Sequence, residues 1–81
     1  MREGAFITEN FASWIVESMI DDLGRMVLHD EKLIDIKRKA ATFNRRIERQ
    51  VLPNMTSGTR NYFLQEHGHD IAFIRDFCDN I

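Results

Sequence analysis

One segment, residues 30–52, constrains the fold more than any other because it has the pattern of a single long amphipathic helix. Its apolar residues recur at alternating spacings of three and four, which is the repeat of one helix face. At 100° per residue they fall within about 80° of one another. These residues are Leu33, Ile36, Ala40, Phe43, Ile47 and Val51. A stripe of this length has to be covered, so we expect the rest of the chain to pack against it.

The other side of the same helix is strongly basic. The chain as a whole is acidic, with a formal net charge of −2 and a pI near 5.8, yet residues 37–49 carry a net charge of +5. Seven of the eleven Lys and Arg residues lie in this helix, namely Lys32, Lys37, Arg38, Lys39, Arg45, Arg46 and Arg49. Such a face is either a solvated surface balanced by acidic neighbours or an electrostatic docking surface.

A first long helix is predicted from an N-cap at Thr8 to about Leu28. Gly24 lies inside it and marks a point where the helix could kink or end early. Asp30 is then expected to cap the second helix, and residues 1–7 are expected to form a tail. The apolar stripe of the first helix is Phe11, Ile15, Met19, Leu23 and Met26.

Pro53 ends the second helix, because its ring disfavours helical geometry at the preceding residue. Two short helices are predicted in the remainder of the chain, over residues 59–67 and 70–81. Gly68 is expected to be the C-cap of the first of these, and Asp70 the N-cap of the second.

These patterns predict an all-α fold, since no segment shows the sustained alternation of a strand. We expect one domain over residues 1–81, a small helical bundle of two long antiparallel helices plus two short C-terminal helices. A domain of this size buries only about 60–65% of its unfolded surface and is marginal alone. A homo-oligomer or a partner protein is therefore anticipated.

The cellular setting is constrained by what the sequence lacks. The single cysteine, Cys78, rules out an internal disulfide and suits a reducing compartment. Residues 1–10 show no apolar segment of a signal peptide, and no apolar run is long enough to cross a membrane. We expect a cytoplasmic protein without a membrane partner.

Trp14 is unusual because helical spacing places it away from the apolar stripe, among polar residues. Tryptophan dominates many protein interfaces, since it offers a large apolar area and one hydrogen-bond donor. Either Trp14 belongs to an interface or another segment of the chain covers it.

The segment containing His67, His69 and Asp70 has residue types that bind metals, but its spacing matches no metal motif. Roles at helix ends account for all of these residues and are favoured over metal binding, so we expect no metal site. No nucleophile elbow and no glycine-rich phosphate loop is present. We expect no catalytic site and no cofactor, and hence no enzyme.

Two classes of function remain. The first is a non-enzymatic protein-binding module, such as a small regulatory adaptor or inhibitor, that docks on an acidic partner surface. The second is a nucleic-acid-associated protein that binds phosphates without sequence readout. The acidity of the whole chain favours the first class. In both, the residues expected to contact the partner are Lys37, Arg38, Lys39, Arg45, Arg46 and Arg49, with Trp14 as a further candidate in the first.

Overall fold

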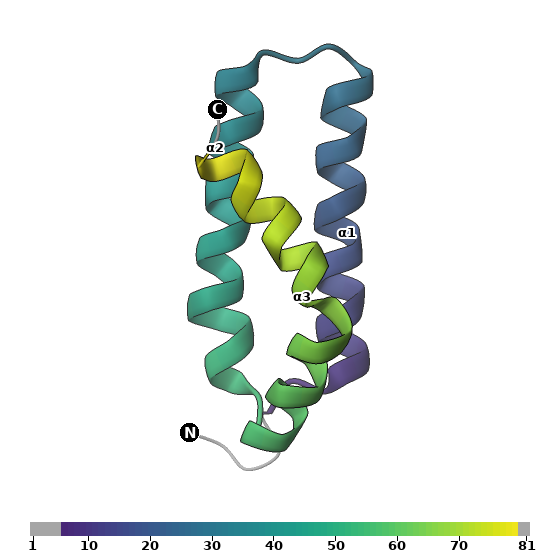
Figure 1. Cartoon of the computed structure of the whole chain (residues 1–81), viewed down its shortest axis with the longest axis vertical. Coiled ribbons are helices and arrows are strands. Elements are labelled where there is room, and N and C mark those ends of the chain that lie inside the picture. The colour runs from purple at the N-terminus through teal and green to yellow at the C-terminus, as the bar shows by residue number, and fades with distance from the viewer. Residues whose placement is uncertain (1–5, 80–81) are drawn as a thin grey trace.

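The computed structural model describes residues 6–79 and contains three α-helices (Figure 1). Helix α1 spans Glu9–Leu28, helix α2 spans Leu33–Arg46 and helix α3 spans Ser57–Asp79. Helices α1 and α2 form an antiparallel hairpin, and α3 lies diagonally across one side of it (Figure 1). The all-α prediction is confirmed, and no strand occurs in the part of the chain described.

Helix α1 begins where the sequence predicted and runs through Gly24 without ending. Its N-cap is Thr8, whose Oγ1 accepts a hydrogen bond from the backbone N–H of Phe11 at 3.2 Å. The tail before it is tied to the domain at Ile7, whose N–H donates to the carbonyl of Asn54 at 2.8 Å. The remainder of the predicted tail, residues 1–5, lies outside the described residues.

The role predicted for Asp30, in the turn between α1 and α2, is wrong. This residue has a φ of 56°, and its N–H donates to the carbonyl of Val27, while the N–H of Glu31 donates to that of Met26. The pattern is a Schellman motif, so Asp30 terminates α1 and does not cap α2. Helix α2 begins three residues later than predicted, at Leu33.

The segment after α2 continues in a wider and then a tighter helical turn. Residues Ile47–Val51 form a π-helical turn, η1, and Leu52–Asn54 form a 3₁₀ turn, η2. The N–H of Leu52 donates to the carbonyl of Ile47, five residues back, as a π-helix requires. Buried Phe43, Ile47, Val51 and Met55 are spaced by four, which would drift around a regular helix by about 40° per step. The wider turn keeps them facing the core.

The last part of the fold differs from the prediction, because the two short helices expected at 59–67 and 70–81 are one continuous helix. Gly68 and Asp70 lie inside α3 and cap nothing. The carboxylate of Asp70 contacts the rings of its neighbours His67 and His69 instead. The predicted end of the last helix, residues 80–81, lies outside the described residues.

The core lies between the three helices, and each helix contributes three or four buried residues. The buried apolar residues are Ala12, Val16, Met19 and Leu23 of α1, Ile36, Ala40 and Phe43 of α2, Ile47, Val51 and Met55 after it, and Phe63, Ile71 and Ile74 of α3. Two residues predicted for the apolar stripes are instead exposed: Leu33 by 63% and Phe11 by 50%. Leu33 opens α2 at the tip of the hairpin, beyond the reach of α3 (Figure 1).

None of the helices in residues 6–79 has both the length and the apolar character that crossing a membrane would take.

The continuity of α3 can be tested at Gly68. A Cβ built on this residue meets no atom within 4 Å, and its φ lies outside the left-handed range. We expect Gly68→Ala to raise the free energy of unfolding by about 0.5–1 kcal/mol, because alanine restricts the unfolded chain and favours helix. Urea denaturation followed by circular dichroism measures this. Gly24→Ala, in the middle of α1, is the matched control and is expected to stabilise equally. A destabilised Gly68→Ala would indicate a helix end there.

The placement of the core can be tested on α2. Phe43 is buried whereas Leu33, ten residues earlier on the same helix, is exposed. We expect Phe43→Ala to lower the free energy of unfolding by about 3–5 kcal/mol, as removal of a buried aromatic side chain does. Leu33→Ala should change it by about 0.5 kcal/mol or less. Equal losses in the two variants would mean that the tip of the hairpin is covered.

Candidate functional site

The basic side of α2 is exposed. We call Arg38, Lys39, Arg45, Arg46 and Arg49 the basic row; all five side chains are exposed, while Lys37 is half-buried at its flank. Among the side chains of residues 6–78 no carboxylate lies at ion-pairing distance from any member of the basic row. The interpretation of this face as balanced by acidic neighbours is therefore not supported within that range.

The one acidic residue of this stretch, Glu48, is turned towards α3. The guanidinium of Arg75 on α3 donates to the Glu48 carboxylate at 3.2 Å and to the side-chain oxygen of Asn44 at 3.1 Å. These contacts attach α3 to one side of α2. Since Glu48 is engaged there, it does not neutralise the basic row.

Trp14 is also exposed, by 63%. Its ring stacks on that of Phe11, with 5.9 Å between the ring centroids, so two aromatic side chains form one apolar patch on α1. Trp14 borders a hollow of about 170 Å³ between α1 and α2. The hollow is lined by Trp14, Ile15, Ser18, Met19, Asp22, Phe43 and Arg46.

Arg46 joins the Trp14 patch to the arginines. It lines the Trp14 hollow and also a second one, of about 230 Å³, formed by Thr42, Arg45, Arg46, Arg49 and Gln50. A third hollow lies towards the tip of the hairpin, and Asp22 lines both this hollow and the Trp14 hollow. The residues that line the third hollow are Asp22, Arg25, Met26, His29, Glu31 and Lys39. The second hollow, the arginine hollow, lies on α2 and the turn after it and has no α1 residue in its lining. We call the three hollows together the hairpin groove. No α3 residue lines it.

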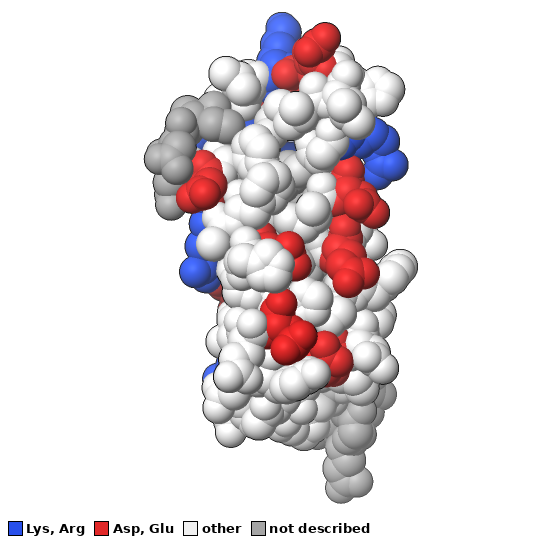
Figure 2. Space-filling view, turned by 45° about the vertical axis from the view of Figure 1, so that its right-hand side comes forward, with Lys and Arg blue, Asp and Glu red and all other residues white. Residues whose placement is uncertain are grey.

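The two walls of the hairpin groove differ in charge. The α2 wall presents Lys39, Arg45, Arg46 and Arg49, whereas the α1 wall presents one carboxylate, Asp22, and one guanidinium, Arg25. Acidic side chains gather on the outer side of α1, which Figure 2 shows together with the side that carries α3 and not with the groove. On the α1 wall, Asp22 is paired with Arg25, whereas on the α2 wall the Lys39 ammonium lies 5.8 Å from the ring centroid of Phe43.

The structure therefore brings together only part of the predicted partner surface. Lys39, Arg45, Arg46 and Arg49 line the same groove as Trp14, whereas Lys37 and Arg38 line none of the three hollows. The sequence pattern did not show that Trp14 and Arg46 are neighbours, because this depends on how α1 and α2 are rotated against each other.

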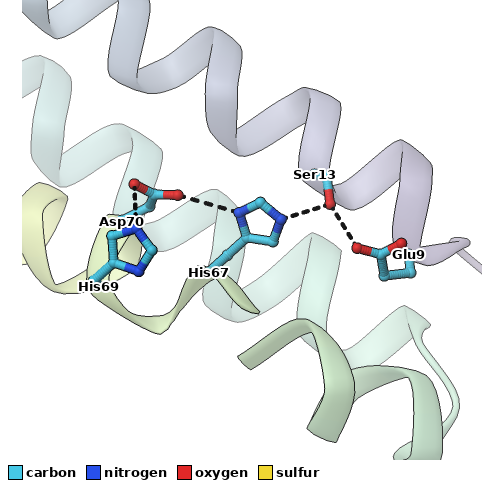
Figure 3. Close-up of polar contacts among 5 residues, drawn as sticks. All are labelled: Glu9, Ser13, His67, His69 and Asp70. Carbon is cyan, nitrogen blue, oxygen red and sulfur yellow. Dashed lines mark hydrogen bonds and ion pairs between the residues drawn. The ribbon is translucent and has the colours of Figure 1, made fainter. Parts of the chain in front are cut away.

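A second polar arrangement connects α1 with α3 (Figure 3). The hydroxyl of Ser13 lies 2.9 Å from the Glu9 carboxylate and 2.8 Å from Nε2 of His67, and Nδ1 of His67 lies 3.1 Å from the Asp70 carboxylate. The ring of His67 also packs on that of Phe63, with 5.2 Å between centroids. Sequence analysis missed the Ser13–His67 contact, because it depends on the packing of two distant helices.

The order serine, histidine, aspartate resembles that of a hydrolase triad, but the surroundings differ. In such a triad the histidine accepts the serine proton, whereas the hydroxyl of Ser13 donates to Glu9. Ser13 lies within α1, where its own backbone N–H and those that follow it are bonded along the helix and cannot form an oxyanion hole. Neither Ser13 nor His67 lines any of the three hollows. These contacts serve to pack α3 on α1.

The histidine cluster forms no metal site in the described part of the chain. His69 Nε2 lies 3.4 Å from the Asp70 carboxylate and His67 contacts the other oxygen of the same group. Among the side chains of residues 6–78, no group of three or more His, Cys, Asp or Glu is arranged to hold a metal ion.

Comparison of the chain with protein-family models, with curated proteins and with solved structures gives no match.

The link between α1 and α3 can be tested at Ser13. We expect Ser13→Ala to lower the free energy of unfolding by about 1 kcal/mol relative to Ser18→Ala, because it leaves half-buried His67 and Glu9 without a shared partner. Ser18 is exposed on the same helix, so the control removes the effect of alanine on helix propensity. Urea denaturation of both variants gives the difference. No difference between them would mean that the hydrogen bonds do not hold α3 in place.

Proposed function

We propose that this protein is a non-enzymatic protein-binding module, a small adaptor or inhibitor, that binds an acidic amphipathic helix of a partner in the hairpin groove. The observation that carries the proposal is the position of Arg46, which lines both the Trp14 hollow and the arginine hollow. An apolar anchor and a cationic wall are thereby parts of one surface.

The chemistry of the groove defines the partner. The exposed rings of Phe11 and Trp14 offer an apolar contact of the kind that dominates interface energies. The guanidinium groups of Arg45, Arg46 and Arg49 pair with no carboxylate among the described side chains. They attract carboxylates and can bind them in bidentate geometry. A helix with apolar residues on one face and Glu or Asp beside them satisfies both requirements, as in other helix-in-groove complexes.

Binding of nucleic acid is the second candidate, and the hollow between Arg45, Arg46 and Arg49 favours it because three guanidinium groups converge there without a carboxylate. The acidity of the chain as a whole weakens it, because a domain with a formal net charge of −2 lacks the basic total that is usual for proteins that bind a phosphate backbone.

The proposal is tested by titrating the protein with a helical peptide that lacks tryptophan and carries a leucine stripe flanked by glutamates. We expect the fluorescence of Trp14, the only tryptophan of the chain, to change on binding. Arg46→Glu should weaken binding at least tenfold, because it places a negative charge in the centre of the groove. Arg38→Glu, on the same helix but outside the groove, is the matched control and should weaken binding much less.

Two further ligands separate the candidate functions. A peptide with the same leucine stripe but lysines in place of glutamates should not bind. Labelled single-stranded and duplex DNA should not bind at near-physiological salt, as fluorescence anisotropy measures. Equal binding of both peptides would remove the electrostatic basis of the proposal. DNA binding that is lost in Arg46→Glu while the acidic peptide fails to bind would favour the nucleic-acid function instead.

A further inference from the structure

We propose that the arginine hollow binds a phosphate group, carried by a phosphoserine or phosphothreonine of the partner helix. This inference rests on the proposed function and names the regulation of the same site. The residues that line the hollow are Thr42, Arg45, Arg46, Arg49 and Gln50. Phosphorylation of the partner then controls how tightly its helix docks.

Three guanidinium groups meet at this hollow without a counter-charge. Arg45 and Arg46 end α2, and Arg49 belongs to the π-helical turn that follows. All three side chains are exposed, and among the side chains of residues 6–78 no carboxylate lies at ion-pairing distance from them. Glu48, which lies between them in the sequence, is held by Arg75 of α3 at 3.2 Å. The positive charge of the hollow is therefore available to a ligand.

Helical spacing brings the donors of the hollow together. Arg45 and Arg49 are four residues apart, and so are Arg46 and Gln50, and residues four apart are neighbours on the surface of a helix. Each guanidinium has five N–H donors, and the side-chain amide of Gln50 has two more. The hollow is thus lined mainly by donors, which suits a ligand that consists of acceptors.

The charge and the donors of the hollow match a phosphomonoester better than a single carboxylate. A carboxylate brings one negative charge and two oxygens, so it leaves part of the arginine cluster without an anion. A phosphorylated side chain brings about −1.5 to −2 charges at pH 7 and three acceptor oxygens at one point. Each of the three guanidinium groups can then bind a phosphate oxygen in a charge-assisted hydrogen bond.

The size of the hollow is also sufficient. Its volume is about 230 Å³, whereas one water molecule occupies about 30 Å³ of the liquid. A phosphate group, with one phosphorus and four oxygens, fits in this space.

The phosphodiester backbone of a nucleic acid matches the hollow less well. Its phosphates carry one negative charge each and are spread along the strand, so a protein neutralises them with cations spread along a surface. Here three guanidinium groups surround one hollow, and the chain has a formal net charge of −2. A doubly charged group at a single point is therefore favoured over a strand.

Arg46 determines where the phosphate lies relative to the apolar anchor of the partner. It lines both the arginine hollow and the Trp14 hollow, so the two hollows are neighbours. On a partner helix, residues three or four positions apart are neighbours in the same way. We expect the phosphorylated residue to lie three or four positions from the apolar residue that contacts Trp14.

The test compares three forms of the leucine-striped acidic peptide, which differ only at one central position with a leucine four residues away on each side. That position carries serine, glutamate or phosphoserine, and the fluorescence of Trp14 measures the affinity of each form. We expect phosphoserine to bind about tenfold more tightly than serine and about threefold more tightly than glutamate, because it brings more charge and a third acceptor oxygen.

Two double variants locate this gain. Arg45→Gln with Arg49→Gln removes two guanidinium groups of the hollow and keeps Arg46 in place. Its preference for phosphoserine over serine should fall to about twofold or less. Lys32→Gln with Arg38→Gln removes the same charge from α2 and its N-cap, outside the hollow, and should retain the preference. All four side chains are exposed, and circular dichroism checks that both variants are folded.

The phosphate site is overturned if the phosphoserine and glutamate forms bind equally, or if the preference survives in Arg45→Gln with Arg49→Gln. Binding of the glutamate form in either case leaves the docking function in place. Failure of all three forms to bind instead refutes the docking function itself. Labelled DNA that binds the unmodified chain but not this double variant, while the phosphoserine form fails to bind, would assign the hollow to a nucleic acid.

Discussion

The packing of α3 against both helices of the hairpin is the contact on which the rest of the structure depends. Helices α1 and α2 each contact α3 more extensively than they contact each other. Phe63, Ile71 and Ile74 of α3 fill the space between them, and burial of such side chains contributes about 1.5–3 kcal/mol each. Polar links at His67 and Arg75 fix α3 to the hairpin from both sides. Because one helix cannot cover both sides, the side opposite α3 is left as the groove.

The elements that were predicted correctly are those that local pattern determines. Helix α1 has an N-cap at Thr8, and the apolar repeat of α2 places Ile36, Ala40 and Phe43 in the core. The break predicted at Gly68 was wrong, because glycine and aspartate are typical of helix ends but are also tolerated inside a helix when tertiary contacts outweigh their propensity. In α3 the flanking Phe63 and Ile71 are both buried on the hairpin, which favours a continuous helix.

The candidate site was less predictable than the fold. Each helix taken alone places Trp14 away from the apolar stripe and Arg46 on the basic face, and the structure places both residues at the surface. That they border one hollow depends on the rotation of α1 against α2, which in turn depends on where α3 packs. The contact between Ser13 and His67 joins residues 54 positions apart in the chain, so no local pattern could indicate it.

The π-helical turn at Ile47–Val51 has a consequence for how the sequence can vary. Five residues there occupy little more than one turn, so the segment holds one residue more than a regular helix of the same length would. Loss of a single residue from it would leave an ordinary α-helical turn and preserve the direction of everything that follows. Gain or loss of a residue within α2 itself would instead rotate the basic row by about 100° relative to the core. The loss of one residue from the π-helical turn therefore disturbs the orientation of the neighbouring segments less than a change of length within α2.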